Sequence, residues 1–253
     1  ITCPVHFVDH HFAHATSAYY TSGFDDALVI SLDGGGDRKS SAVYTVRGGR
    51  WEKVSDTSSF DSLGNYYAYV TYLCGFKPMR HEGKITGLAA SGQPVYVPLL
   101  KEFVDEEDGR IVNRAGVAFL EAIRALDRRL PKGWTREDLA SSIQTHFEDV
   151  CRRFVRHWVR RTGLHDVALA GGVPANVRVN EEIHALPEVH RLFVHPHMGD
   201  GGLSVGAALA ACVPGVLERT MPADPPDLHR RTSFPGVETD VRRLPARPGR
   251  SQR

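Results

Sequence analysis

The chain has 253 residues, of which 42% are hydrophobic and 24% charged, with 31 Lys and Arg residues against 30 Asp and Glu residues. This composition is that of an ordinary globular protein and excludes a disordered, collagen-like or coiled-coil chain. The net charge of +1 gives no electrostatic footprint for a nucleic acid or an anionic membrane, so we expect neither as a partner.

The sequence also lacks the usual marks of a membrane or secreted protein. No apolar stretch reaches the roughly 18 residues that a membrane-spanning helix needs, and the first residues lack the pattern of a secretion signal. The four cysteines are scattered without a CxxC pair, which argues against a disulfide framework and a cysteine-based zinc site. We therefore expect a cytoplasmic protein. Because the chain opens without Met and directly in an apolar segment, we expect it to be a fragment.

The first half of the chain alternates short apolar segments with helical spacing. Residues 5–8 predict a strand, and the Ala-rich segment after them predicts a helix that is capped by Asp9 and stops at Ser22 and Gly23. Three β-branched segments then predict a meander whose first turn is rich in glycine. The predicted strands span residues 27–32, 42–46 and 51–54, and the predicted helices span residues 63–73 and 85–91.

The second half contains a strand, a glycine turn and a helix twice in succession. The predicted elements are helices at residues 117–130 and 136–162, a strand at 167–170, a helix from about Pro174, a strand at 192–195 and a helix that ends near Ala211. From residue 214 the composition shifts to Pro and Arg with few apolar residues. Such a segment cannot offset its ordering entropy, so we expect a poorly ordered tail over residues 214–253.

Two histidines, His10 and His14, stand four residues apart at the start of the first predicted helix. Their imidazoles therefore lie on one face within reach of a single ion, and this spacing recurs in metal sites. Chance also produces such pairs, so a metal pair and an ordinary pair of histidines both stay open. A zinc protease of the HExxH type is disfavoured, because His11 stands where that motif has its general-base Glu. His11 points elsewhere on the helix and is expected to support the ligands or contact a substrate.

Glycine turns follow three predicted strands, at residues 33–37, 171–172 and 199–202. In the first, bare N–H groups would let a phosphate approach and Asp33 would hold a metal or its water, although a plain hairpin uses the same glycines. The second precedes a helix N-terminus, where an anion is favoured and Asn176 is placed to bind a nucleotide or phosphate. In the third, Asp200 is either an N-cap or a metal ligand. All lie at strand ends or helix starts, where an α/β fold collects its site.

Seven separated motifs carry a resemblance. Residues 9–20 (DHHFAHATSAYY), 27–34 (ALVISLDG), 62–64 (SLG) with 71–78 (TYLCGFKP), and 82–89 (EGKITGLA) follow one another in the first part. Residues 171–173 (GGV) with Asn176, and 199–202 (GDGG) with 206–208 (GAA), complete the series. In type and order, this series resembles the carbamoyltransferases of the NodU and nebramycin-synthase type.

The resemblance implies an α/β protein with the two-lobed, actin-like ATPase (ASKHA) fold. This fold is similar to that of the threonylcarbamoyl-transferring enzyme of tRNA modification and of the last domain of HypF. The chain would contain the end of lobe one at residues 1–26 and a complete lobe two at residues 27–213. The family's opening strands and its second, YrdC-like domain would lie outside it.

The resemblance also implies the site residues. In that family the HxxxH pair and the Asp of the GDxG turn hold one divalent metal, which maps onto His10, His14 and Asp200; this set suits Fe, Mn or Zn. Nucleotide contacts map onto Asp33, Gly34, Gly35, Gly36, Gly171, Gly172 and Asn176. Glu82 and Lys84 belong to a family segment near the cleft, and the alternative is that they are surface salt-bridge partners.

The implied activity is O-carbamoyl transfer. Carbamoyl phosphate and ATP would form a carbamoyl-adenylate, and a hydroxyl of a small molecule, such as a sugar or an antibiotic, would attack it. His11 is the residue to which the role of general base falls. Two other interpretations stay open: a truncated, catalytically incomplete fragment that binds metal or nucleotide, and an actin-like sugar kinase, which the HxxxH pair disfavours.

Overall fold

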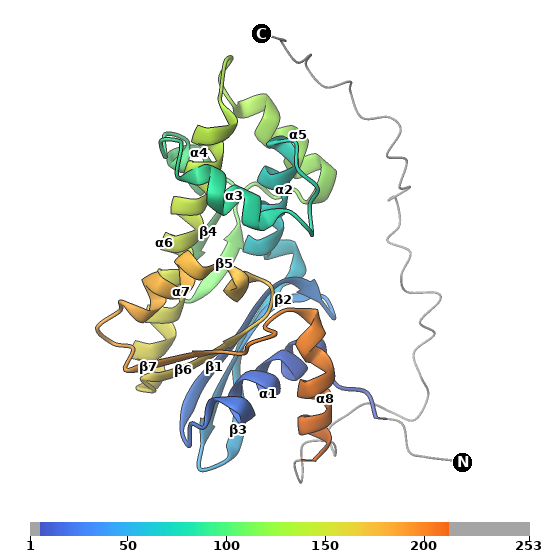
Figure 1. The fold of residues 1–253 in the computed structure, drawn as a ribbon, viewed down its shortest axis with the longest axis vertical. Helices are drawn as coiled ribbons and strands as arrows, with labels where there is room; N and C mark the ends of the chain where they lie inside the picture. Colours follow the sequence, from blue (N-terminus) through green and yellow to red (C-terminus); the bar gives the residue numbers. More distant parts are fainter. Residues whose placement is uncertain (1–5, 213–253) are drawn as a thin grey trace. The chain divides into compact units, whose positions relative to one another are not determined.

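The computed structural model describes residues 6–212, so the tail expected over residues 214–253 lies outside the described residues. A five-stranded mixed sheet forms the centre of the described part (Figure 1). Its strands are β1 (Ala27–Gly36), β2 (Lys39–Arg47), β3 (Arg50–Ser58), β6 (Asp166–Ala170) and β7 (Arg191–Val194), in the order β3-β2-β1-β6-β7. The predicted meander is confirmed, since β1, β2 and β3 pair antiparallel, whereas β6 pairs parallel with both β1 and β7.

Helices cover both faces of this sheet. Alternate side chains of a strand point to opposite faces, so Leu28 and Ile30 join one apolar cluster and Val29 joins the other. The first cluster packs against α2 (Leu63–Leu73) and α6 (Arg136–Thr162). The second packs against α1 (His10–Ser22), and α8 (Leu203–Ala211) lies along α1 (Figure 1). In residues 6–212, none of the helices is both long enough and apolar enough to cross a membrane.

Local capping signals explain where the long helices begin and end. The side chains of Asp9, Ser62 and Thr135 each accept a backbone N–H at the start of α1, α2 and α6. Gly23 and Gly163 end α1 and α6 with left-handed φ values of 72° and 67°, which glycine adopts without the usual steric cost. The predicted bounds of the second and last of these helices, 63–73 and 136–162, are confirmed.

Two predicted elements differ in the structure. The strand predicted at residues 5–8 is wrong for its described part, because residues 6–9 have no regular secondary structure and pair with no described strand. The helix predicted from about Pro174 is split into a 3-10 turn, Val173–Ala175, and α7 (Val177–His184). The split occurs because Asn176 has an extended backbone and caps α7 with its side chain.

The remaining helices are α3 (Glu82–Ala89), α4 (Val97–Lys101) and α5 (Phe119–Arg129). A second sheet, which sequence patterns did not predict, is the hairpin of β4 (Val104–Glu107) and β5 (Arg110–Asn113). Its strands are short and rich in charge, so they lack an apolar alternation. The signal that would have revealed the hairpin is its turn, where Asp108 and Gly109 both have positive φ, as an Asp-Gly hairpin turn requires.

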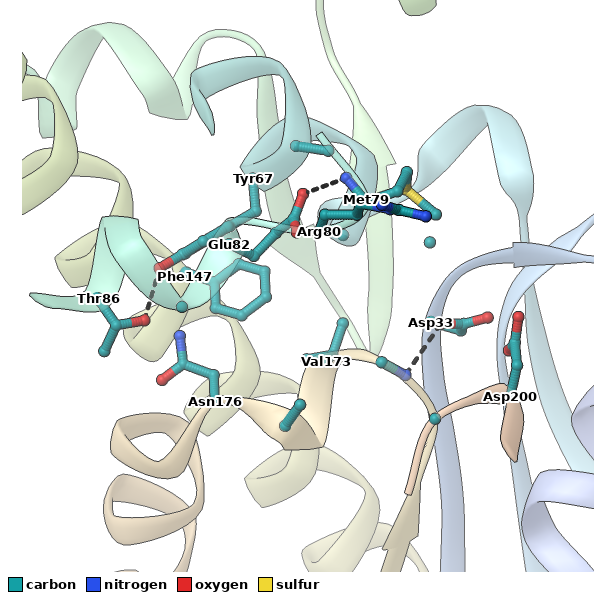
Figure 2. Close-up of a pocket in the computed structure, with 17 residues that line it drawn as sticks. Asp33, Tyr67, Met79, Arg80, Glu82, Thr86, Phe147, Val173, Asn176 and Asp200 are labelled. Carbon is teal, nitrogen blue, oxygen red and sulfur yellow. Dashed lines mark hydrogen bonds between the residues drawn. The ribbon is translucent and has the colours of Figure 1, made fainter. Parts of the chain in front are cut away.

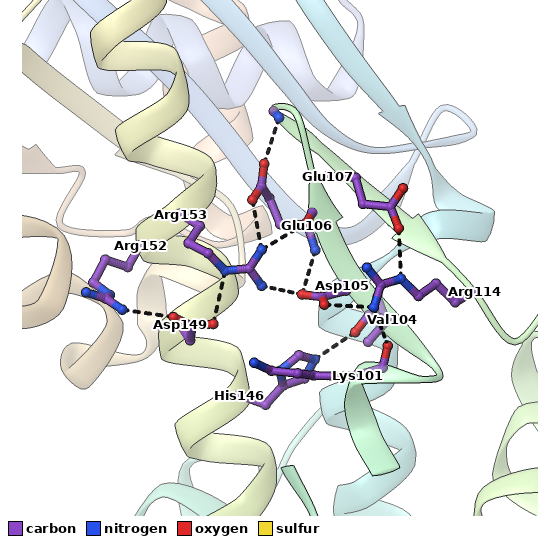
Figure 3. Close-up of polar contacts among 11 residues, drawn as sticks. Lys101, Val104, Asp105, Glu106, Glu107, Arg114, His146, Asp149, Arg152 and Arg153 are labelled. Atoms are coloured by element: carbon purple, nitrogen blue, oxygen red, sulfur yellow. Dashed lines mark hydrogen bonds and ion pairs between the residues drawn. The ribbon is translucent and has the colours of Figure 1, made fainter. Parts of the chain in front are cut away.

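Ion pairs hold this hairpin to α6 (Figure 3). The Arg153 guanidinium donates to Asp105, to Glu106 Oε2 at 2.9 Å and to Asp149 Oδ2 at 3.0 Å. Arg114 bonds to the second oxygen of Asp105 at 2.9 Å. Burial alone would raise the pKa of Asp105, but the hydrogen bond and charge of Arg153 lower it overall. Asp105 is therefore ionised and links two arginines beneath the hairpin.

We expect replacement of Asp105 by Asn to lower the free energy of unfolding at pH 7 by about 1–3 kcal/mol, because Arg153 keeps its charge and loses a partner. The pKa of Asp105 is lowered on folding from about 3.9 in the unfolded chain, so its contribution is present above about pH 4 and is lost as the pH falls through the folded pKa. In urea titrations, the difference from the unmodified chain should shrink below pH 4. Asp127→Asn, at an exposed position of α5, is the control, and equal stability of both variants at pH 7 would contradict this role.

Candidate functional site

Helix α1 presents two histidines at the end of strand β1. The carboxylate of Asp9 accepts the N–H of Phe12 at 3.0 Å, and Asp37 in the turn after β1 accepts the N–H of His10 at 2.8 Å. The Asp9 bond caps α1, and the Asp37 bond holds the first turn of α1 against the β1–β2 turn. His10 and His14 follow one helical turn apart, with ring centroids separated by 4.7 Å, so both rings lie on one face of the helix.

Two carboxylates from distant parts of the chain meet these rings. Asp33 lies near the end of β1, and Asp200 begins the 3-10 turn Asp200–Gly202 after β7. His10 Nε2 lies 3.0 Å from Asp33 Oδ2 and 3.8 Å from Asp200 Oδ1. His14 Nε2 lies 4.0 Å and 3.6 Å from the same two oxygens. One donor atom from each of the four residues thus lies within 4.8 Å of all the others; we call these residues the four-residue cluster.

Burial keeps His14 neutral. Its side chain is 0% exposed, and neither ring nitrogen has a hydrogen-bond partner in the described part of the chain. Burial lowers the pKa of His14 to about 4, since a charged imidazolium would be poorly solvated there. At neutral pH one ring nitrogen of His14 therefore carries a lone pair that is available to a ligand.

His10 and Asp33 form a charge-assisted pair at the edge of the cluster. The hydrogen bond to Asp33 raises the pKa of His10, although burial opposes the shift. Burial acts to raise the pKa of Asp33, but hydrogen bonds from His10 and from the backbone N–H of Gly172 lower it overall. The Gly172 bond to Asp33 Oδ1 is 2.9 Å long, which leaves Oδ2 facing the histidines.

The donor set fits a divalent metal ion. Donor atoms around a four-coordinate ion with bonds of about 2.1 Å lie about 3.4 Å apart. The shortest and longest of the four distances between imidazole nitrogens and carboxylate oxygens, 3.0 Å and 4.0 Å, bracket that distance. A bond to the ion would also satisfy a buried nitrogen of His14 that otherwise lacks a partner. Two imidazoles and two carboxylates suit Fe, Mn or Zn, with Asp33 as a fourth donor beside His10, His14 and Asp200.

Glycines at close contacts allow these groups to meet. A Cβ on Gly36 would lie 2.3 Å from the His10 ring, and a Cβ on Gly206 of α8 would lie 1.8 Å from the carbonyl oxygen of Ala13 in α1. Gly171 has a φ of +107°, and a Cβ there would lie 2.0 Å from the carbonyl oxygen of Leu32. At all three positions a side chain would overlap its neighbours. Gly36 and Gly171, which were predicted to face a nucleotide, therefore meet a packing requirement.

Beside the four-residue cluster lies a cleft of about 460 Å³. Asp33 and Asp200 lie at one end, and Tyr67, Phe147 and Asn176 lie at the other (Figure 2). Of the residues that the sequence assigned to a nucleotide or to the cleft, Asp33, Gly34, Gly172, Asn176 and Glu82 line it, whereas Gly35, Gly36, Gly171 and Lys84 do not. The cleft is mainly apolar at the Phe147 end, and its charged residues are Asp33 and Asp200, Glu82 at the start of α3 and Arg80 in the loop before α3.

A hydrogen-bond network forms the wall of the cleft at its apolar end. Gln144 of α6 accepts from the Tyr67 hydroxyl at 2.6 Å and from Asn176 Nδ2 at 2.9 Å, and it donates to Asn176 Oδ1 at 3.1 Å and to Glu148 at 2.7 Å. Tyr67 also lies 3.0 Å from the Thr86 hydroxyl. All four hydrogen-bonding positions of the Gln144 amide are thus used, which fixes its orientation. Sequence reasoning missed Tyr67 and Gln144, because a helical position carries no sign of a partner distant in the chain; Thr86 falls within the motif at 82–89.

Three other predicted residues lie outside the four-residue cluster. His11 is fully buried, with Nδ1 2.8 Å from the Ser31 hydroxyl, and burial lowers its pKa. Lys84 packs its ammonium group 5.5 Å from the centroid of the Phe76 ring. Glu82 lines the cleft and accepts the N–H of Met79 at 2.6 Å. His11 does not line the cleft.

The part of the chain that carries this arrangement matches one known protein family. The family model "Carbamoyltransferase N-terminus" matches residues 1–209, which include the four-residue cluster and the cleft. The chain belongs to the carbamoyltransferase family. The resemblance that the seven motifs predicted is thereby confirmed.

Two curated relatives are nodulation proteins. The chain is 32% identical over 210 residues to the nodulation protein NolNO of Sinorhizobium fredii, which covers 81% of this chain and 31% of NolNO. It is 33% identical over 209 residues to the nodulation protein NolO of Bradyrhizobium diazoefficiens, which covers 80% of this chain and 38% of NolO. The chain thus spans between 31% and 38% of the length of these two relatives.

The fold is also found in a solved structure. Full-length HypF in its phosphate- and nucleotide-bound form superposes with a TM-score of 0.54 at 15% identity, over 81% of this chain and 35% of that chain. The mixed sheet with helices on both faces is the actin-like ATPase fold that the resemblance implied. At this identity the likeness concerns the fold.

Single replacement of His10, His14, Asp33 or Asp200 by Ala is expected to lower the affinity for a divalent metal by about 10- to 100-fold or more, because each removes one donor of a shared site. Elemental analysis after dialysis against limiting Fe, Mn or Zn measures the loss. His184→Ala, at the exposed end of α7, is the matched control and should retain metal. Undiminished metal in all four cluster variants would refute the site.

Proposed function

We infer that the chain is the nucleotide- and metal-binding part of an O-carbamoyltransferase. In this proposal a carbamoyl group passes from carbamoyl phosphate, through an ATP-derived carbamoyl-adenylate, to a hydroxyl of a small molecule such as a sugar or another natural product. The single observation that carries the proposal is the four-residue cluster at one end of a cleft of about 460 Å³ in a chain of the carbamoyltransferase family.

The geometry of the cleft supports a nucleotide as co-substrate. The apolar end offers Phe147, Val173 and Ala175 for the surface of a base. The opposite end is lined by Asp33 and Asp200, the two carboxylates of the four-residue cluster, for a metal. Pockets of about 300–1,000 Å³ are typical of small-molecule and cofactor sites. The solved relative in fold, HypF, was determined with phosphate and nucleotide bound.

The ligand set would be His10, His14, Asp33 and Asp200. A divalent ion held there would neutralise phosphate charge and polarise the group that reacts. Other groups of the chain have further roles: the backbone N–H of Gly172 fixes Asp33, and neutral His14 offers a lone pair without a proton to displace. Gly34, near the end of β1, lines the cleft without a side chain, so a ligand would be able to approach the backbone there.

The transfer step balances as a substitution at the carbamoyl carbon. The acceptor hydroxyl oxygen forms a bond to that carbon, the bond from the carbon to the adenylate phosphate oxygen breaks, and AMP leaves. The hydroxyl proton must be taken by a base. His11 remains the prediction for this role, because its neutral imidazole has the required chemistry. Since His11 lies against Ser31 and does not line the cleft, the proton would have to leave the cleft to reach it.

A second candidate function is binding without turnover by this chain alone. The observation that favours it is the extent of the match, since the chain spans 31% of NolNO and 38% of NolO. Residues outside this segment would then complete the reaction in the whole protein. The two candidates separate in a direct comparison of binding and turnover.

The test supplies purified protein with ¹⁴C-labelled carbamoyl phosphate, ATP, a divalent metal and a panel of sugar acceptors. In the protein of full genomic length, we expect equal release of pyrophosphate and AMP and label in the acceptor. Asp200→Ala should lower the initial rate about 100-fold, because one cluster donor is lost. His184→Ala should leave it unchanged.

The alternative outcomes are distinct. ATP binding by the 253-residue chain without turnover, combined with turnover by the longer protein, would support the binding role for this chain. Release of ADP with a phosphorylated sugar would indicate a kinase and contradict carbamoyl transfer. Absence of pyrophosphate and AMP release with all acceptors would also contradict it.

A further inference from the structure

The cleft has an imbalance of charge. Asp33, Glu82 and Asp200 line it, and Arg80 is the one Lys or Arg among the described residues that do so. A phosphate-bearing co-substrate adds further negative charge, and desolvating it in an acidic cleft is costly without cations. A metal at the four-residue cluster would supply positive charge at one end. Arg80 supplies it from another wall of the same cleft (Figure 2).

The loop that carries Arg80 is held in an unusual conformation. Met79 has a φ of +62°, a region that residues other than glycine seldom adopt. The N–H of Met79 donates to Glu82 Oε1 at 2.6 Å, and the backbone N–H of Lys77 donates to His81 Nδ1 at 3.1 Å. Backbone strain that neighbouring bonds enforce is typical of ligand-contacting segments. The bent loop brings both Met79 and Arg80 to the cleft.

The same loop lies opposite the glycine-rich end of β1. A Cβ on Gly34 would lie 3.9 Å from Met79 Cε, so side chains of the loop reach that end of the strand across the cleft. Gly34 is among the residues at which the backbone is open to a ligand, because the position has no side chain of its own. A phosphate beside Gly34 would therefore lie next to the loop that carries Arg80.

The Arg80 guanidinium has no partner of its own. Within residues 6–212 it forms no hydrogen bond and no ion pair, although Glu82 follows it closely in the chain. Glu82 is engaged with Met79, and Asp33 is engaged with His10 and Gly172. The other cation of this segment, Lys84, lies against the Phe76 ring. Arg80 is thus an unpaired cation at the cleft, because its acidic neighbours Glu82 and Asp33 are hydrogen-bonded to other groups.

We propose that Arg80 is the residue that recognises the phosphate group of the co-substrate in this cleft. The planar guanidinium donates two parallel hydrogen bonds to phosphate oxygens, a geometry that an ammonium group cannot reproduce. The ligand class is a phosphate-bearing small molecule, either a nucleotide or an acyl phosphate. The inference rests on the proposed function, since it assigns a further contact to the co-substrate of that site.

The test compares ligands with and without phosphate. Calorimetric titration of the full chain, with the metal present, measures the binding of adenosine, AMP, ATP and carbamoyl phosphate. Arg80→Met should weaken the binding of a phosphate ligand about 10- to 100-fold and leave adenosine unchanged, because only phosphate contacts are lost. Arg80→Lys should recover part of the affinity. Arg124→Met, at an exposed position of α5 away from the cleft, is the matched control and should bind as the unmodified chain does.

The four ligands show which co-substrate carries the phosphate that Arg80 contacts. They also separate a failure of the Arg80 assignment from a failure of the proposed function. Weakening for AMP and ATP assigns Arg80 to the nucleotide, and weakening for carbamoyl phosphate alone assigns it to the acyl phosphate. Equal affinity of Arg80→Met and the unmodified chain for every phosphate ligand would overturn the assignment while leaving the proposed function intact. A loss of adenosine binding equal to that of ATP would also overturn it, since the variant would then act through the cleft as a whole. An unmodified chain that binds none of the phosphate ligands would contradict both.

Discussion

The hydrogen bond of 3.0 Å between His10 and Asp33 joins helix α1 to the end of strand β1, and the candidate site depends on this junction. The bond can form only because Gly36 has no side chain, since a Cβ there would lie 2.3 Å from the His10 ring. Gly206 similarly lets α8 approach the backbone of α1. The turn that carries Asp200 leads directly into α8. Close backbone approach at these two glycines therefore brings together donors that are far apart in the chain.

Charge in this junction is arranged so that His14 and Asp33 each keep one protonation state. Burial holds His14 neutral, and hydrogen bonds from His10 and Gly172 hold Asp33 ionised against the opposing effect of burial. A neutral imidazole and an ionised carboxylate are the forms that ligate a metal. The same principle recurs away from the site, where Arg153 holds Asp105 ionised beneath the β4–β5 hairpin against the opposing effect of burial. The two carboxylates differ in what they can bind: Asp105 is paired with arginines of the protein, whereas Asp33 lines a cleft that a ligand can enter.

The cleft combines two chemistries within one enclosure. Its apolar end is bounded by Phe147 and by the Tyr67, Gln144 and Asn176 network, in which Gln144 has no spare hydrogen-bonding position. Its other end is lined by Asp33 and Asp200 of the four-residue cluster, in which both ring nitrogens of His14 lack a hydrogen-bond partner in the described structure. Polar groups whose hydrogen bonds are all made within the protein fix the shape of a site, whereas polar groups without a partner are available to a ligand. The end with the unsatisfied His14 nitrogens is the one at which we propose that a metal and a phosphate bind.

Much of the local structure was determined by the sequence. The capping residues Ser62 and Thr135 and the terminal Gly163 set the bounds of α2 and α6, because caps act within one turn of the chain. The spacing of His10 and His14 placed both on one helical face, and the ordered motifs predicted the family and its fold. The strand predicted at residues 5–8 was wrong over its described residues, 6–8, because a strand needs a neighbour to pair with, which no local pattern can supply.

Only the tertiary structure decided which residues meet. Asp33 and Asp200 are separated by most of the described chain, and parallel pairing of β1, β6 and β7 brings both to the histidines. In the folded chain Lys84 lies against the Phe76 ring, whereas Arg80 lines the cleft. The sequence of residues 80–84 does not predict which of these two cations reaches the cleft. Sequence periodicity determines the face on which a side chain lies, whereas partners across the sheet are determined by strand order and by where glycine permits close contact.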